Sequence, residues 1–569
     1  FFGKLFGLTL LMFTLLFTGA SAETYEGTGL GYDKDGIVLD VEITNNKIVD
    51  VKVKRAKESE FATPAIQKIA KKVIATQSLD VDGVSGASLT SEGTKEAIEE
   101  AVKESGVTLT AVTLQNTKAV ELPKEADVVV IGAGGAGLTS AIAAHEKGAK
   151  VILIEKTELL GGNTNYATAG LNAAGTKIQE KLGIKDSPEL FYEDTMKGGK
   201  NKNNKELVRV LVNNSSAIVD WLTERGADLS ELTSTGGQSV KRTHRPTGGS
   251  AVGPNIVAAL SKTAESEKID IRKGTKAIAL VKAKNKIVGV KVREVDGKEY
   301  TIKAKAVIVA TGGFGANAKM VEKYNPKLKG FGSTNSPAIV GDGIIMVEKV
   351  GGALVDMSEI QTHPTVVHNK TNMITEAVRG EGAILVNRDG KRFIDELETR
   401  DVVSKAILSQ KGKSAFLIFD EDIRTKLKAA DGYVKKGFAV EGTLEEIAAK
   451  IGTDAKTLEA TLNKYNEAVK NKADSEFNKK NLPKELTGTK YYAIEISPAV
   501  HHTMGGVHIN TNAEVLGKNG RPIKGLYAAG EVTGGIHGAN RIGGNAVADI
   551  TIFGKIAGEN AAIYSKSVK

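Results

Sequence analysis

The sequence contains no cysteine among its 569 residues. It therefore cannot hold an iron–sulfur cluster through thiolates, attach haem through a CxxCH motif, form a disulfide or carry a lipid on cysteine. It also lacks internal repeats, low-complexity tracts and basic runs interleaved with aromatic residues. The formal net charge is +9, but the lysines are scattered, so we interpret the charge as a solvated surface and expect no nucleic-acid partner.

The composition is that of a globular protein, with 25% charged and 41% hydrophobic residues, and the length allows several domains. Residues 1–22 form an apolar run that ends in Ala20-Ser21-Ala22. This pattern is typical of a secretory signal peptide cleaved before Glu23. An uncleaved membrane anchor is the alternative, although the run is short for a span. Either interpretation predicts a secreted, cell-surface or periplasmic protein.

Residues 23–107 indicate a small α+β domain. Two alternating segments, 37–43 and 47–53, flank a short turn and predict a hairpin with one buried face. Thr63 and Pro64 predict the start of a helix that runs to about Thr76, with the threonine as its cap. A loop at 81–93 precedes a further helix, and the uneven stretch 108–123 is interpreted as a linker.

The most informative stretch is 126–156, where an apolar strand leads into glycines and a helix, and then into a second strand that ends at Glu155. Gly132 permits the tight turn, Gly134 lets the backbone approach a pyrophosphate, and Gly137 lets the helix, which includes Ala136, pack close to the strand. A carboxylate at the position of Glu155 suits a ribose hydroxyl. Together these features predict a dinucleotide site.

Two further segments resemble parts of flavoprotein reductases and favour FAD over NAD. Residues 159–176 resemble the loop that wraps the FAD pyrophosphate and ribityl chain. Residues 525–562 resemble the closing segment, in which an acid holds the ribityl chain and a helix beginning near Gly544-Asn545-Ala546 faces the flavin pyrimidine. The FAD-binding residues implied in this way, with Asp342 of the VGDG motif, are Gly162, Asn163, Thr164, Ala169, Gly170, Asp342, Glu531, Ala546 and Val547.

Five motifs carry a resemblance to soluble flavoprotein fumarate reductases, in the branch shared with flavocytochrome fumarate reductases and urocanate reductase. They are THPT (362–365), ITEAVRGEGAILVN (374–387), KRFIDELETRD (391–401), HHTMGG (501–506) and GANRIGGNA (538–546). The resemblance implies an α/β, Rossmann-like FAD-binding domain in two parts, 124–357 and 498–569. Between these parts it implies an inserted α+β cap domain, 358–497.

The resemblance also implies a catalytic constellation. Arg400 stands at the position of the family's proton donor, and Glu376 and Arg379 would relay protons to it. The residues implied in substrate binding are His363, Thr375, His501, Arg541, Gly170 and Gly544. From the residues alone, a buried ion-pair network is the alternative interpretation of the two arginines and the glutamate. A monovalent cation is also implied near Thr503, Met504, Gly505, Glu531 and Thr533.

Residues 82–88, DGVSGAS, resemble the sequence on which a flavin transferase attaches FMN through a phosphoester. Ser88 would be the acceptor and Thr90 the second choice, whereas a helix-capping loop is the structural alternative. Because Asn163 replaces the histidine that carries covalent FAD in membrane-bound relatives, we expect FAD to be non-covalent. Electrons would pass from an external donor, such as a membrane electron-transfer chain, through FMN to FAD.

The function predicted from these features is extracytoplasmic reduction of fumarate to succinate. A reductase of another unsaturated acid, such as urocanate or an acrylate- or cinnamate-type compound, is the second possibility. A non-catalytic flavin electron carrier is the third.

Overall fold

The structure is a computed structural model that describes residues 22–32, 36–58, 62–84, 86–112 and 122–568. The apolar run 1–21, most of the expected linker and Ser85 lie outside the described residues. The contacts divide the chain into an N-terminal unit, which ends at Lys118, and a C-terminal unit that starts at Ala119. Among the described ranges, no helix combines the length and the apolar character needed to cross a bilayer.

The N-terminal unit is a three-stranded antiparallel sheet with two helices. The sheet order is β1 (Glu23–Gly29), β2 (Ile37–Thr44) and β3 (Lys47–Ala56), and the helices are α1 (Pro64–Thr76) and α2 (Ser88–Ser105). The predicted hairpin is confirmed as β2 and β3. Strand β1 was not predicted, because its glycines and polar residues give no clear alternation. The predicted side-chain cap is wrong, since the Thr63 side chain accepts no capping hydrogen bond.

The FAD-binding part of the C-terminal unit is built on an eight-stranded sheet, in which β10-β11-β21-β12-β4-β5-β9 are neighbours and β20 pairs with β21. The parallel centre consists of β4 (Glu125–Ile131), β5 (Val151–Ile154), β9 (Asp270–Arg272), β12 (Glu299–Val309) and β21 (Pro522–Ala528). Strands β10 (Lys276–Ala283) and β11 (Lys286–Arg293) form an antiparallel hairpin at one edge, and β20 spans Glu514–Leu516.

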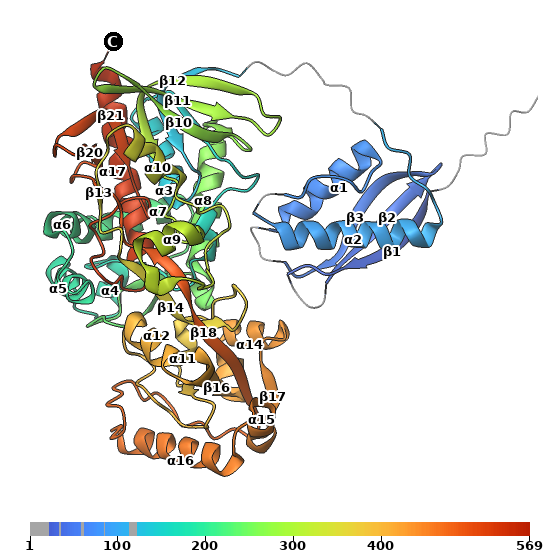
Figure 1. The fold of residues 1–569 in the computed structure, drawn as a ribbon, viewed down its shortest axis with the longest axis vertical. Coiled ribbons are helices and arrows are strands. Elements are labelled where there is room, and N and C mark those ends of the chain that lie inside the picture. Colours follow the sequence, from blue (N-terminus) through green and yellow to red (C-terminus); the bar gives the residue numbers. More distant parts are fainter. Residues whose placement is uncertain (1–21, 33–35, 59–61, 85, 113–121, 569) are drawn as a thin grey trace, which may run out of the picture. The chain divides into compact units, whose positions relative to one another are not determined.

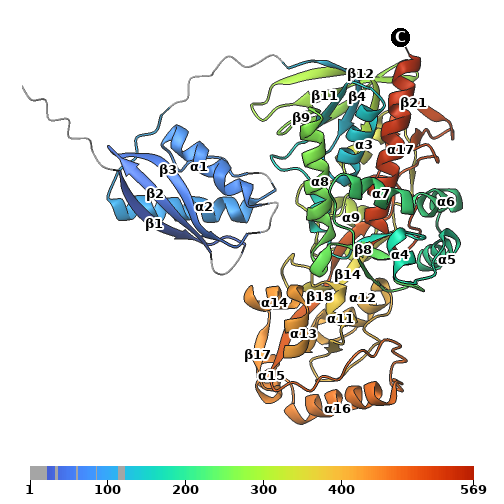
Figure 2. The same cartoon turned by 180° about the vertical axis from the view of Figure 1, so that it is seen from behind.

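Segments from both ends of this unit meet in the same layer. Strand β21 pairs with β12, and the C-terminal helix α17 (Asn545–Ser567) packs along α3 (Gly135–Glu146), as Figure 1 shows. From behind, α8 (Val252–Ser266) covers the sheet near β9 (Figure 2). The central residues 128–130, 152–153 and 307–309 of this sheet are fully buried, as apolar runs in parallel sheets require.

Smaller elements complete the FAD-binding part. Its other helices are α4 (Lys177–Lys181), α5 (Pro188–Gly198), α6 (Lys205–Asn213), α7 (Ser215–Glu224), α9 (Ala318–Tyr324), α10 (Asp342–Lys349) and the short η1 (Gly162–Tyr166), η2 (Thr247–Gly249) and η3 (Pro326–Leu328). Its short strands are β6 (Leu171–Asn172), β7 (Glu231–Thr233), β8 (Thr243–Arg245), β13 (Leu354–Val355) and β19 (Gly506–Val507).

The cap has its own sheet, ordered β14-β18-β16-β15 with β17 beside β18. These strands are β14 (Ile360–Val367), β15 (Ile384–Val386), β16 (Ala415–Asp420), β17 (Val440–Gly442) and β18 (Tyr491–Thr503). Its helices are α11 (Glu376–Gly380), α12 (Arg400–Leu408), η4 (Lys411–Lys413), α13 (Glu421–Lys426), α14 (Lys428–Lys435), α15 (Leu444–Ile451) and α16 (Ala455–Asn471).

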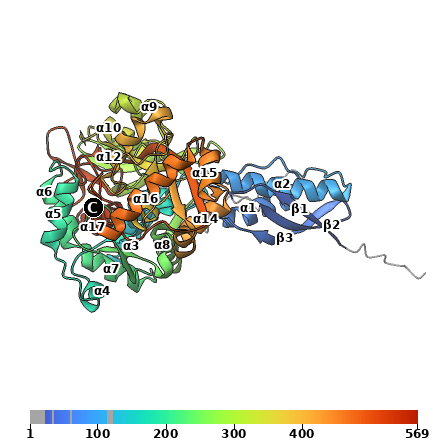
Figure 3. The same cartoon turned by 90° about the horizontal axis from the view of Figure 1, so that it is seen from below.

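The cap also has a separate hydrophobic core, drawn from residues between Val367 and Ile496. Helix α16 lies across its outer end, as the views from the side and from below show (Figures 1 and 3). Strand β18 does not stop near residue 497, where the cap was expected to end, but continues to Thr503. The predicted fold class is confirmed.

Candidate active site

The turn after β4 has the geometry that a dinucleotide requires. Gly132 has a φ of +98°, and a Cβ there would lie 2.5 Å from the Ala310 carbonyl oxygen. A Cβ on Gly137 would lie 1.7 Å from the Gly132 oxygen, so only glycine lets α3 approach the turn this closely. Glu155, at the end of β5, accepts a hydrogen bond from the Ala133 amide at 2.8 Å. The acid therefore faces the glycine-rich turn.

The loop predicted to wrap the pyrophosphate meets this turn. The Thr164 hydroxyl accepts from the Gly135 amide at 3.0 Å, at the start of α3. Asn163 donates from Nδ2 to Asn335 Oδ1 at 2.6 Å and to Glu531 Oε2 at 3.2 Å. Gly162, Asn163 and Thr164 thus lie where segments from both ends of the FAD-binding part converge.

Glu531 is a partly buried carboxylate at the centre of that convergence. Its Oε1 accepts from the Thr503 amide at 3.1 Å. Burial raises its pKa above the usual range, and the donors from Thr503 and Asn163 only partly oppose this effect. A partly buried acid of this kind, beside a glycine-rich turn, fits the hydroxyl groups of a ribityl chain.

Helix α17 begins beside the same site. Gly544 has a φ of +88°, and a Cβ there would lie 2.2 Å from Asn172 Oδ1. Ala546 and Val547 lie in the first turn of this 23-residue helix, whose positive end suits an electron-rich ring. Gly170 is equally confined, because its Cβ would lie 2.5 Å from the His244 oxygen. The turn at Gly132, the loop of Asn163, Glu531 and the start of α17 together fit FAD.

Asp342 and Ala169 lie at the margin of the FAD-binding segments. Asp342, at the start of α10, accepts a hydrogen bond from Lys156 Nζ at 2.5 Å. Lys156 directly follows Glu155 in the sequence. The Asp342 side chain is 24% exposed. Asp342 therefore lies at the edge of the predicted FAD site, where it forms an ion pair with Lys156. Ala169 precedes Gly170 in the loop that follows η1.

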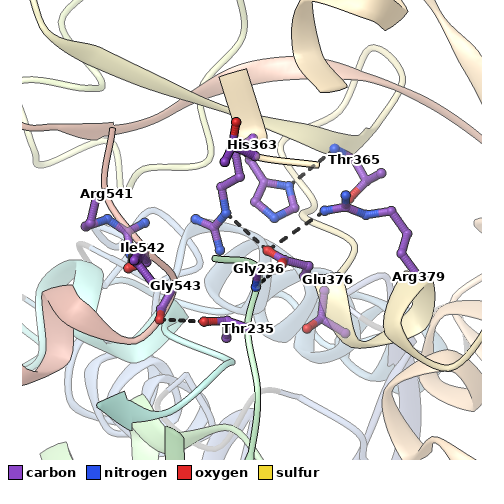
Figure 4. A network of polar contacts seen from close by, with 12 residues as sticks. Thr235, Gly236, His363, Thr365, Glu376, Arg379, Arg541, Ile542 and Gly543 are labelled. Atoms are coloured by element: carbon purple, nitrogen blue, oxygen red, sulfur yellow. Dashed lines mark hydrogen bonds and ion pairs between the residues drawn. The ribbon is translucent and has the colours of Figure 1, made fainter. Parts of the chain in front are cut away.

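Two arginines flank one carboxylate where the cap meets the FAD-binding part. Glu376 Oε2 lies 3.3 Å from Arg400 Nε and 4.0 Å from Arg379 Nη2. Glu376 Oε1 accepts from the Gly236 amide at 2.9 Å, as Figure 4 shows. Arg379 Nη1 donates to the Glu396 carbonyl at 2.5 Å. The structure therefore brings Glu376, Arg379 and Arg400 together, with Arg379 at ion-pair distance from Glu376.

The pKa values of this cluster reflect burial and mutual charge. Burial by itself raises the pKa of Glu376, but Arg400, Arg379 and the Gly236 amide outweigh it, so the net pKa is lowered. Burial lowers the pKa of Arg379, and Arg400 lowers it further. Burial and the charge of Arg400 also lower the pKa of Arg541, to about 9. The cluster holds more positive charge than its own carboxylate neutralises.

Gln361 connects Arg541 to this cluster and was not predicted from the sequence. Its Oε1 accepts from Arg541 Nη2 at 3.0 Å and from Arg400 Nη1 at 3.4 Å. Its Nε2 donates to Asn540 Oδ1 and to the Arg541 carbonyl, both at 2.8 Å. A signal was available, because alternation along a strand places residues 361 and 363 on the same face.

Two histidines lie beside the arginines. The rings of His363 and His501 are 5.1 Å apart, and the Thr334 hydroxyl lies 2.7 Å from His501 Nδ1. Burial, followed by the charge of Arg400, lowers both pKa values well below the usual range, so both rings are neutral. His363 Nδ1 accepts from the Thr365 amide at 3.3 Å, whereas its buried Nε2 has no hydrogen-bond partner among the described residues. That nitrogen can serve a ligand.

Thr375 caps the helix that carries Glu376. Its hydroxyl accepts from the Ala377 amide at 3.4 Å, and its own amide donates to the Tyr433 hydroxyl at 3.0 Å. The loop of Thr235 and Gly236, also missed from the sequence, reaches the site from the other side. Thr235 donates to the Gly543 carbonyl at 2.8 Å and so fixes the loop next to the helix of Glu376 and the segment of Arg541.

The residues expected around a cation are only partly gathered. Thr503 and Glu531 are in contact through the hydrogen bond from the Thr503 amide described above. The Thr533 hydroxyl donates to the Gly530 carbonyl at 2.8 Å, and the Met504 amide donates to the Glu359 carbonyl at 3.0 Å. Gly505 packs closely against the backbone of Asp356. A cation at this place stays a prediction.

The two candidate FMN acceptors differ in exposure. Ser88 is the first residue of α2 and is exposed. Thr90 is 2% exposed, and its hydroxyl donates to a Glu58 carboxylate oxygen. Only the Ser88 hydroxyl is open to a modifying enzyme.

Comparison with known proteins identifies the family. Residues 127–547 match the model described as FAD binding domain, and residues 31–103 match the FMN-binding domain. The chain is 52% identical over 442 residues to a fumarate reductase (cytochrome) of Shewanella frigidimarina, with 77% of each chain covered. It is 35% identical over 565 residues to a urocanate reductase of Eggerthella lenta, which covers 96% of this chain and 93% of that protein.

A longer relative and a solved structure agree with this assignment. The chain is 45% identical over 534 residues to an NADH:fumarate oxidoreductase of Klebsiella pneumoniae, covering 93% of this chain but only 57% of that protein. The open conformation of a flavocytochrome c3 fumarate reductase superposes with a TM-score of 0.69 at 44% identity, with 78% of each chain covered. The chain therefore belongs to the FAD-dependent flavoprotein fumarate reductase family and carries an FMN-binding domain ahead of its FAD-binding part.

Proposed function

We propose that the protein reduces fumarate to succinate. The observation that carries the proposal is the charge of the buried cluster, in which Arg379 and Arg400 lie within 4.0 Å of the Glu376 carboxylate and Arg541 is joined to Arg400 through Gln361. The excess corresponds to two positive charges, which a dicarboxylate would neutralise. Buried charge is stable only when it is paired.

FAD fits the cradles around Gly132, Glu155, Asn163, Glu531 and the start of α17, and, when bound, it supplies a hydride for a C=C bond. FAD would be bound without a covalent link, because Asn163 stands where some relatives carry a histidine. The side chain of Asn163 is instead engaged with Asn335, Ser336 and Glu531.

The residues of the chain would orient the diacid from both ends. Arg541 offers a planar fork for one carboxylate, and His501 adds a neutral ring beside it. His363, with its unpartnered Nε2, and Thr375 would hold the other carboxylate. Gly170 and Gly544 leave room because each lacks a side chain in a confined place.

Arg400 would hold the proton that is transferred to carbon. Its Nε faces Glu376 and its Nη1 faces Gln361. The proton delivered to the substrate would therefore come from Nη2. Glu376 Oε2 would return a proton to Nε, and Arg379 would in turn supply Glu376. The lowered pKa of Arg379 favours its part in this relay.

The electron supply is also part of the proposal. FMN attached by a flavin transferase to the exposed Ser88 hydroxyl would receive electrons from an external donor, such as a membrane electron-transfer chain. The absence of cysteine supports this route, because no haem or cluster can be held through thiolates. The apolar run 1–22 supports an extracytoplasmic location.

A panel of unsaturated acids tests the substrate. The full-length protein loaded with both flavins should oxidise a reduced dye faster with fumarate than with urocanate, acrylate or cinnamate. The polar groups at both ends of the site favour a dicarboxylate. A higher kcat/KM with urocanate or a monocarboxylate would refute the assignment, and no turnover with any acid would favour an electron carrier.

A further inference from the structure

A cavity of about 320 Å³ lies at the seam between the cap and the FAD-binding part. Its walls include Glu231 and Arg245 from one side, and Thr375, Lys426, Lys428 and Tyr433 from the cap. This volume is many times the roughly 10–15 Å³ that a single water requires. A four-carbon diacid therefore fits in it. We call this cavity the antechamber.

Arg245 is the distinctive group of the antechamber. Its Nε is buried and finds no hydrogen-bond partner within the part of the chain that the structure describes. Gly249, with a φ of +68°, packs on the guanidinium, and a Cβ there would lie 2.7 Å from Nη2. Throughout the described residues, Arg245 forms no ion pair. A half-buried guanidinium held in this way is ready for an anion.

The carboxylates in the walls are already engaged. Glu231 accepts from the amides of Gly248 at 2.8 Å and Gly249 at 3.1 Å. Glu381 pairs with Lys426. Lys428, like Arg245, has no carboxylate partner in the described part of the chain. The walls thus hold three cations, Arg245, Lys426 and Lys428, against two carboxylates, so the lining carries an excess of one positive charge.

The antechamber adjoins the arginine cluster. Thr375 lines the cavity, and the next residue is Glu376, which contacts Arg400 at 3.3 Å. The Tyr433 hydroxyl, in the same wall, accepts from the Thr375 amide. An anion held at Arg245 would therefore lie next to the helix turn that leads to the catalytic groups.

We propose that the antechamber is a carboxylate-binding site that captures the anionic substrate before it reaches Arg400 and Arg541, with Arg245 as its binding residue. This inference rests on the proposed reduction of fumarate. It adds a second, outer site whose task is association and not chemistry. A cationic site of this kind raises the rate of capture of an anion and loses its effect in salt.

The test compares Arg245→Gln with the wild-type holoenzyme in fumarate-dependent oxidation of a reduced dye at several ionic strengths. We expect kcat/KM to fall about fivefold to tenfold at low salt while kcat is unchanged, as for the loss of electrostatic capture. The dependence of kcat/KM on ionic strength should flatten. Arg245→Lys should retain most of the wild-type kcat/KM, because it keeps the charge.

Arg209→Gln is the matched control, since it removes one positive charge from an exposed arginine that pairs with Glu189 outside the antechamber. If it lowers kcat/KM as much as Arg245→Gln, overall charge explains the effect and the inference is wrong. Ala429→Phe, which fills the cavity from the cap, should also lower kcat/KM without lowering kcat. Failure of the wild type to reduce fumarate would instead refute the proposed function.

Discussion

Arg541 donates from Nη2 to Gln361 Oε1 over 3.0 Å, although the two residues are 180 positions apart. The same oxygen accepts from Arg400, so one amide holds in register the two arginines that we propose as carboxylate clamp and proton donor. Gln361→Leu should raise KM for fumarate and lower kcat about tenfold, within the range for misplaced catalytic groups. Gln361→Glu should weaken substrate binding more, because its charge neutralises one arginine. Steady-state kinetics check both variants, and an unchanged kcat in Gln361→Leu would contradict the positioning role.

Arg400→Lys should reduce kcat for fumarate by about 10²- to 10⁴-fold, the range for loss of a general acid. Lysine keeps the charge, but it lacks the fork that lets one guanidinium face Glu376 and Gln361 together. Dye oxidation with saturating fumarate measures the loss. Arg388→Lys, at an arginine paired with Glu495 within the cap, is the control and should retain activity. Equal activity of Arg400→Lys and wild type would favour the electron carrier.

The pH profile of kcat/KM should fall on the alkaline side near pH 9. The pKa of Arg541 in the free protein is lowered to about 9 by burial and then by Arg400. Above that pH the clamp loses its proton and its charge, so dianion binding weakens about tenfold per pH unit. Bound substrate favours the charged form, and the break in kcat should therefore lie at higher pH than the break in kcat/KM. Coincident breaks would contradict the assignment.

Lys479→Met should destabilise the cap by about 3–5 kcal/mol, as expected when one partner of a buried ion pair is removed. Lys479 Nζ and Glu396 Oε2 are 2.9 Å apart, and both side chains are fully buried. The control is Lys464→Met, because the Lys464–Glu476 pair is exposed and should contribute less than about 1 kcal/mol. Urea unfolding monitored by circular dichroism compares the two. Equal losses would show that burial of the pair is not decisive.

Ser88→Ala should abolish covalent FMN attachment, whereas Thr90→Val should leave it intact. Ser88 is exposed, but the Thr90 hydroxyl is buried and bound to Glu58. Intact mass of each variant, produced together with a flavin transferase, reports the modification directly. Retention of the FMN mass in Ser88→Ala would move the acceptor elsewhere. Tm measured in parallel separates loss of the acceptor from loss of the fold.

The sequence predicts the parts of the site that are encoded by local spacing or that lie in the family motifs. The turn at Gly132 and the acid at Glu155 belong to one contiguous βαβ unit, so glycine spacing and strand pattern were sufficient. Gln361 and the Gly236 amide act through approaches between distant segments. Strand alternation places Gln361 on the face of His363, but no local pattern shows which distant residues either group contacts. The short β1 was missed for a different reason, because it is stabilised by pairing with β2 and not by its own hydrophobic alternation.

Strand β18 joins two tasks in one piece of backbone. Its first half pairs with β16 in the cap, and its last residues pair with β14 and carry His501 and Thr503 to the flavin side. A tilt of the cap sheet would therefore displace the His501 ring and also the Thr503 amide that donates to Glu531. Movement of the cap would then change the contacts to the diacid and the contacts to the ribityl chain at the same time.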